Sequence, residues 1–70
     1  MAELIKNNVN KLRIDKKMTQ EELATLVGVS RQTIIAIEKG NYTPSVHLAL
    51  KLSKEFKLKV DEIFYISNEK

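Results

Sequence analysis

The sequence contains no cysteine and no tryptophan, and only two glycines and one proline. Without cysteine, the chain has neither a disulfide nor a thiolate ligand for a metal ion. No apolar run approaches the roughly 20 residues of a membrane span, and the first residues do not have the pattern of a signal peptide. These absences favour a cytoplasmic protein with no membrane association.

Length and charge set further limits. Seventy residues correspond to one domain, which we expect to span residues 1–70. A domain of this size buries only about 60% of the surface that its unfolded chain exposes, so its stability depends on close helix packing or on a second subunit. The 12 basic residues outnumber the 9 acidic ones and give a net charge of +3. This balance indicates only a modest preference for nucleic acid.

The middle of the chain predicts two short helices joined by a tight turn. Thr19 and Glu22 have the spacing of a capping box, which starts a helix over residues 20–27. Gly28 follows, where a residue of positive φ would end that helix, and Ser30 can cap a second helix. The expected apolar stripe of the first helix consists of Leu23, Leu26 and Val27.

The second helix, expected over residues 31–39, has an outward face of mixed chemistry. Ile34, Ile37 and Glu38 recur at helical spacing and form its inward face. The remaining residue types suit the major groove of DNA, where Arg pairs with guanine, Gln with adenine, and Ala or Ile packs on a thymine methyl. The periodicity alone also allows an ordinary helical hairpin with a mixed exterior. The expected base contacts are Arg31, Gln32, Ile35 and Ala36.

Three more helices are expected around this pair. Residues 8–17 and 60–64 show helical spacing. In residues 45–56, large apolar residues alternate with smaller or polar ones as in a half-buried strand, but the length, the leucine, alanine and lysine content, and the preceding cap and proline favour a helix. His47 is the only histidine, and we expect a surface residue there rather than a metal ligand.

The central segment resembles the helix-turn-helix of the Cro and phage-repressor family, the xenobiotic-response-element type. The resemblance extends from about Val9 to Phe64 and includes the phrases SRQTI, IEKG and TPS. It implies an all-α, five-helix repressor-like DNA-binding domain. It also implies an ion pair between Arg13 and Glu38, and a phosphate contact from Gln20. The other positions that match are Leu23, Ala24, Val27, Gly28, Val29, Ile34 and Ile37.

The loop after the second helix would lie beside the DNA groove that this helix occupies. Its side chains and amides could therefore donate to phosphates, which fix the register of a protein on DNA without reading its sequence. Tyr42 could instead pack partly into the core. The full set of expected phosphate contacts is Gln20, Thr33, Lys39, Asn41, Tyr42 and Thr43.

Two copies of the chain are expected to act together. One module reads too few base pairs to find a single site in a genome, whereas two copies about 34 Å apart would read a palindrome. We also expect Leu4–Lys6 to form an antiparallel strand beside Phe64–Ser67. The expected dimer interface consists of Leu58, Ile63, Phe64 and Ile66.

The function expected from these features is that of a transcriptional repressor, which blocks its double-stranded operator DNA by occupying it. No cofactor and no small-molecule effector domain are expected. An enzyme is disfavoured because the sequence has no paired carboxylates, metal cluster or glycine-rich phosphate loop. The alternative is an antitoxin-like or adaptor module that binds a protein, since Ile35 is apolar at an outward position.

Overall fold

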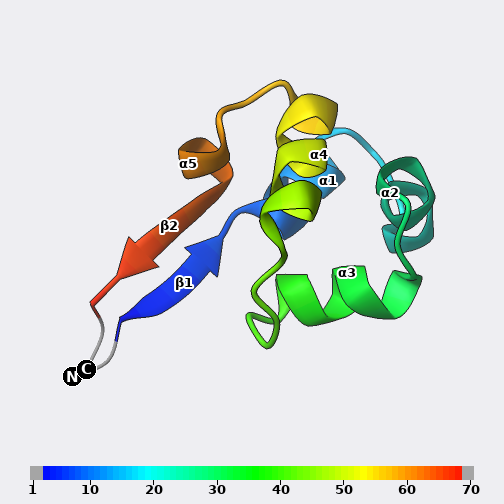
Figure 1. Cartoon of the computed structure of the whole chain (residues 1–70). Coiled ribbons are helices and arrows are strands. Elements are labelled where there is room, and N and C mark those ends of the chain that lie inside the picture. Colours follow the sequence, from blue (N-terminus) through cyan, green and yellow to red (C-terminus); the bar gives the residue numbers. More distant parts are fainter. Residues whose placement is uncertain (1–2, 69–70) are drawn as a thin grey trace.

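The computed structural model describes residues 3–68, in which five helices are joined to a small antiparallel sheet (Figure 1). This is the fold class that the sequence predicts. In chain order the elements are β1 (Leu4–Asn7), α1 (Val9–Asp15), α2 (Gln20–Val27), α3 (Arg31–Glu38), α4 (Val46–Phe56), α5 (Val60–Ile63) and β2 (Phe64–Ser67).

The start of α2 is fixed by a capping box. The amide of Glu22 donates to the hydroxyl oxygen of Thr19 over 3.0 Å, and the amide of Thr19 donates to a carboxylate oxygen of Glu22 over 2.8 Å. The two bonds satisfy amides that a helix start otherwise leaves without intrahelical partners. The predicted bounds of this helix, residues 20–27, are confirmed.

Gly28 makes the turn between α2 and α3. Its φ of 75° lies in the left-handed region, where a residue with a side chain is strained. The amide of Val29 then reaches back to the carbonyl oxygen of Ala24 over 2.9 Å. Ser30 caps α3 by accepting a hydrogen bond from the amide of Thr33. Local chemistry therefore sets the angle between the two helices.

Other helix ends differ slightly from the prediction. α1 is shorter than the predicted residues 8–17, because Lys17 has a φ of 59° that an α-helix cannot continue. α5 ends one residue before the predicted bound at position 64, because Phe64 has the extended backbone of a strand, with φ −116° and ψ 141°. α3 and α4 match their predicted ranges to within one residue.

The hydrophobic core takes side chains from all five helices. α4 contributes buried residues spaced four apart, whereas Val46 and Leu50, which a strand would place on the same face as these residues, are exposed. The strand-like alternation in this segment therefore does not describe its structure. The buried apolar residues are Val9, Leu23, Ala24, Val27, Ile34, Ile37, Leu48, Leu52, Phe56 and Ile63.

The apolar stripe predicted for α2 is wrong at one position. Leu26 is 55% exposed, whereas Leu23, Ala24 and Val27 are buried. Leu23, Ala24 and Val27 lie on the face of α2 that packs against the core, and Leu26 lies outside this face.

The predicted pairing of the two terminal segments is confirmed within the chain. β1 and β2 are antiparallel, and Figure 1 shows this ribbon at one end of the molecule. We call the two strands the β-ribbon. Its register pairs Leu4 with Ser67, Ile5 with Ile66, Lys6 with Tyr65, and Asn7 with Phe64.

The predicted dimer interface is corrected by the burial of its members. Ile63 is 0% exposed in the core, so it has no surface to offer to a second subunit, and its assignment to the interface is wrong. Leu58 and Phe64 are partly buried against the same core. Ile66, in contrast, is 59% exposed.

Within residues 3–68, none of the helices has the length and apolar character needed to cross a bilayer.

Candidate nucleic-acid interface

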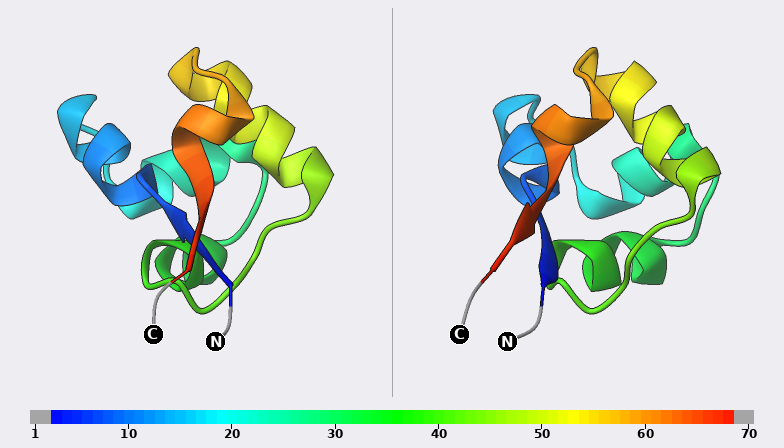
Figure 2. Two further views of the ribbon diagram at one scale, coloured as in Figure 1. Left: turned by 90° about the vertical axis from the view of Figure 1, so that its left-hand side faces the viewer. Right: turned by 60° about the vertical axis from the view of Figure 1, so that its left-hand side comes forward.

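α3 lies along one side of the molecule and turns one face outward (Figures 1 and 2). Ile34 and Ile37 are fully buried and hold the helix against the core. The side chains on the outward half of α3 and at its end are exposed or partly exposed. They include the four residues predicted to contact bases: Arg31, Gln32, Ile35 and Ala36.

The outward face combines hydrogen-bonding groups with small apolar surface. Arg31 and Gln32 lie in the first turn of α3 and are exposed, and Ile35 and Ala36 follow one turn later and are half-buried. Guanidinium and carboxamide groups make bidentate hydrogen bonds to purine edges, and methyl groups pack on thymine. The face can therefore supply both kinds of direct contact that a major groove accepts.

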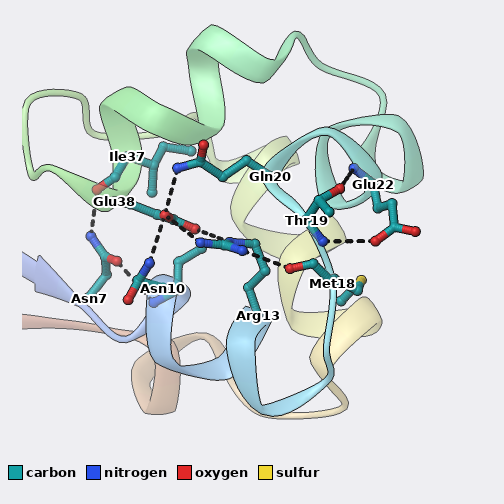
Figure 3. Close-up of polar contacts among 10 residues, drawn as sticks. Asn7, Asn10, Arg13, Met18, Thr19, Gln20, Glu22, Ile37 and Glu38 are labelled. Carbon is teal, nitrogen blue, oxygen red and sulfur yellow. Dashed lines mark hydrogen bonds and ion pairs between the residues drawn. The ribbon is translucent and has the colours of Figure 1, made fainter.

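The opposite edge of α3 is held by Glu38 (Figure 3). Arg13 of α1 lies with its Nε 2.7 Å from Oε2 of Glu38 and its Nη2 3.3 Å from Oε1. The two side chains are only 11% and 6% exposed. The ion pair that the resemblance implies is thus present and nearly dry, so it fixes the position of α3 relative to α1.

Two amide side chains complete this arrangement. Asn10 of α1 donates to Oε1 of Glu38 over 3.0 Å, and Gln20 at the start of α2 donates to the same oxygen over 3.1 Å. Arg13 also donates from Nη1 to the carbonyl oxygen of Met18 over 2.7 Å. We call Asn10, Arg13, Gln20 and Glu38 the Glu38 cluster. It joins α1, α2 and α3 around one carboxylate.

Burial and hydrogen bonding act in opposite directions on the pKa of Glu38. Burial alone raises it, but hydrogen bonds from Arg13, Asn10 and Gln20, together with the charge of Arg13, lower it to below its ordinary value of 4.5. A carboxyl group with a depressed pKa stabilises the fold above its unfolded pKa, and this contribution is lost as the pH falls through the folded value.

Glu38→Gln should therefore be less stable than the wild type at pH 7, with a difference that narrows as the pH is lowered below 4.5. The reason is that protonation of Glu38 in the wild type removes the same charge that the substitution removes. Urea unfolding of both proteins at several pH values measures the difference. A gap that stays constant from neutral to acid pH would show that ionised Glu38 does not stabilise the fold.

The residues predicted to contact phosphates have different surroundings. Lys39, Tyr42 and Thr43 are exposed at the end of α3 and in the loop that follows. Asn41 is exposed too, but its backbone amide already donates to the carbonyl oxygen of Ala36 over 2.9 Å. That amide is therefore not available to a phosphate, which corrects the expectation for the backbone of this residue.

The other two residues of the set lie close to the protein's own polar groups. The Gln20 carboxamide nitrogen donates to Glu38, and the Thr33 hydroxyl lies 3.1 Å from that of Ser30. Both residues are half-buried. Gln20 thus supports α3 through its hydrogen bond to Glu38, whereas Lys39, Tyr42 and Thr43 are exposed to solvent just after α3.

Sequence reasoning missed two asparagines that position α3. Asn10 donates to Glu38, and Asn7 donates from Nδ2 to the carbonyl oxygen of Ile37 over 2.9 Å. The available signal was the run Asn7, Asn8 and Asn10 just before and within α1, because asparagine is common at helix starts and is less favourable inside helices.

No metal site accompanies this surface in the described part of the chain. Residues 3–68 contain no group of three or more His, Cys, Asp or Glu side chains that could hold a metal ion. His47 is exposed at the start of α4.

A capped helix, a glycine turn and a second helix with a free polar face define a helix-turn-helix domain. The chain belongs to the helix-turn-helix family of the Cro and C1 type, whose model, described as "Helix-turn-helix", matches residues 9–63. This is a family of DNA-binding transcriptional regulators and not of enzymes.

Individual proteins agree with this assignment. The chain is 48% identical over 65 residues to an uncharacterized HTH-type transcriptional regulator of Bacillus subtilis, YgzD, covering 93% of this chain and 98% of the relative. It is 30% identical over 60 residues to the cryptic phage CTXphi transcriptional repressor RstR of Vibrio cholerae, covering 86% and 54%. The solved structure of the restriction-modification controller protein C.AhdI from Aeromonas hydrophila is also similar, with a TM-score of 0.72, 31% identity, and 79% and 83% coverage.

Proposed function

We propose that this protein is a sequence-specific transcriptional repressor that binds a palindromic operator as a homodimer, with α3 in the major groove. The observation that carries the proposal is the outward face of α3, where Arg31 and Gln32 are exposed beside half-buried Ile35 and Ala36. These four residues would contact bases. Lys39, Asn41, Tyr42 and Thr43, which follow the helix, would contact phosphates, as would Gln20 and Thr33.

The Glu38 cluster supports this assignment because it makes α3 rigid. A side chain reads a base edge only if the helix that carries it is held in a fixed orientation. Arg13, Asn10 and Gln20 hold the far edge of α3 through one carboxylate, and Asn7 holds its last turn. The binding face therefore needs little ordering when it meets DNA, which favours affinity.

Repression by occupancy follows from this design. A bound dimer excludes other proteins from the operator, and no effector site is needed for that effect. The printed name of the Vibrio cholerae relative describes a transcriptional repressor, which favours repression over activation for this chain. We place the activity in the cytoplasm, where operator DNA is accessible.

Selection of bound sequences from a random pool of duplex DNA tests the proposal. We expect the recovered sequences to contain two inverted half-sites with centres about 10 base pairs apart, since a symmetric dimer presents two α3 helices to one face of DNA. Recovery of an asymmetric site would contradict the palindromic operator. Failure to enrich any sequence, even at low salt, would contradict DNA binding and favour a protein-interaction module.

A further inference from the structure

The outer half of the β-ribbon exposes apolar side chains that neither the core nor α3 uses. The inner half of the ribbon is anchored, because Phe64 packs on the core and Asn7 donates to the carbonyl oxygen of Ile37. A two-stranded ribbon is only marginally stable in water unless a further strand or another element covers it. The residues left more than 40% exposed are Leu4, Ile5, Tyr65 and Ile66.

β2 is an edge strand without the usual protection against pairing. Natural edge strands carry charges, proline or bulges that block the addition of another strand. The segment of residues 64–68, FYISN, carries no charge and no proline. This segment therefore has neither a charge nor a proline that would block the addition of a further strand.

The backbone of β2 also offers free groups at this edge. The amide of Asn8 donates to the carbonyl oxygen of Ile63 over 2.9 Å at the base of the ribbon. Bonded and non-bonded pairs alternate along an antiparallel ladder. The Phe64 amide caps α5 by donating to the carbonyl oxygen of Val60. With the observed register, the carbonyl of Phe64 and the amide and carbonyl of Ile66 point away from β1, toward any strand that adds at this edge.

We propose that the partner on this edge is β2 of a second copy of the chain, paired antiparallel around a two-fold axis at Ile66. The two ribbons then form one four-stranded sheet that spans both subunits. This inference rests on the proposed homodimer and identifies the surface that joins it. Leu58, Ile63 and Phe64 stay in or against the core of each subunit.

Charge favours a second copy here over two other exposed apolar positions, Leu26 and Leu50. A two-fold axis brings identical residues together, so a patch that self-associates must avoid like charges at its centre. Leu26 shares α2 with Glu21 and Glu22, and Leu50 shares α4 with Lys51 and Lys54. The uncharged β2 has no such conflict.

The location of the ribbon suits two copies on one DNA face. Asn7 ties β1 to the last turn of α3, and Figure 2 shows the outer ends of both strands at the same end of the molecule as α3. The longest dimension of the chain is 36 Å. To read two half-sites on one face of DNA, the proposed dimer would have to hold its α3 helices about 34 Å apart, the rise of one DNA turn.

Cysteine cross-linking tests the axis directly, because the natural chain has no cysteine. In a directly opposed hydrogen-bonded pair the two Cα atoms are about 5.5 Å apart, within the range of about 4.4 to 6.8 Å that a disulfide spans. Ile66→Cys should give at least ten-fold more disulfide-linked dimer under mild oxidation than Leu50→Cys, whose position is similarly exposed, at 56%. Equal yields from the two variants would overturn the proposal.

Sedimentation equilibrium of lysine variants gives a second measurement that needs no oxidation. Ile66→Lys should raise the dimer dissociation constant at least ten-fold, whereas Leu50→Lys should leave it unchanged, with circular dichroism showing that both variants fold. A monomeric wild type, or equal effects of both substitutions, would overturn the inference. If the wild type selects a palindrome but Ile66→Cys forms no disulfide-linked dimer, only the ribbon interface is contradicted. If Ile66→Cys forms the linked dimer but the wild type selects no DNA sequence, only the proposed function is contradicted.

Discussion

Glu38→Ala is expected to lower the free energy of unfolding by about 3 to 5 kcal/mol, because it leaves the largely buried guanidinium of Arg13, 11% exposed, without its counter-charge. Arg13 would keep its hydrogen bond to the carbonyl oxygen of Met18, but Asn10 and Gln20 would both lose their acceptor. For a domain of this size the melting temperature should fall by about 12 to 40 °C. Thermal and urea unfolding followed by circular dichroism measures both quantities.

A matched control is available in the same part of the chain. Lys11 and Asp15 form an exposed ion pair at 3.7 Å on α1, and Asp15→Ala should change stability by less than about 0.5 kcal/mol. In a double-mutant cycle, Arg13→Ala combined with Glu38→Ala should cost less than the sum of the single changes. If Glu38→Ala behaves like Asp15→Ala, the Glu38 cluster is not a structural brace.

The helix pair could be predicted because its signals are local. The capping box at Thr19 and Glu22 and the glycine at position 28 each act within a few residues, so sequence spacing alone locates the start of α2 and the turn. The bounds of α1 could not be predicted equally well. Its end depends on Lys17 adopting a left-handed φ. Few residues other than glycine and asparagine adopt such a φ, so a lysine in the sequence does not predict it.

Contacts between distant residues were less accessible. Arg13 and Glu38 are 25 positions apart, and their pairing was expected only from the family resemblance. The roles of Asn7 and Asn10 were missed because each depends on where α3 packs, which no local pattern specifies. The exposure of Leu26 and the burial of Ile63 were not predicted for a similar reason. Hydrophobicity indicates that a side chain can be buried, but the packing of neighbouring helices determines which apolar side chains are buried.

Gln32→Ala and Lys39→Ala should separate base reading from phosphate binding. Gln32 is exposed in the first turn of α3, and one bidentate contact to adenine is worth about 1 to 3 kcal/mol of discrimination. The proposed dimer would make this contact twice, so affinity for the selected operator should fall at least 30-fold, by about 2 kcal/mol or more. Affinity for random DNA should stay unchanged. Fluorescence anisotropy with both DNAs measures this.

Lys39→Ala supplies the contrast, because Lys39 is exposed just after α3 and a lysine that contacts phosphate carries no sequence information. Lys39→Ala should lower the affinity for operator and for random DNA by the same factor. It should also reduce the slope of log affinity against log salt concentration by about 1 per subunit. Both side chains lie on the surface, so neither change should alter the melting temperature by more than a few degrees. Equal losses on both DNAs from Gln32→Ala would mean that this face of α3 does not read bases.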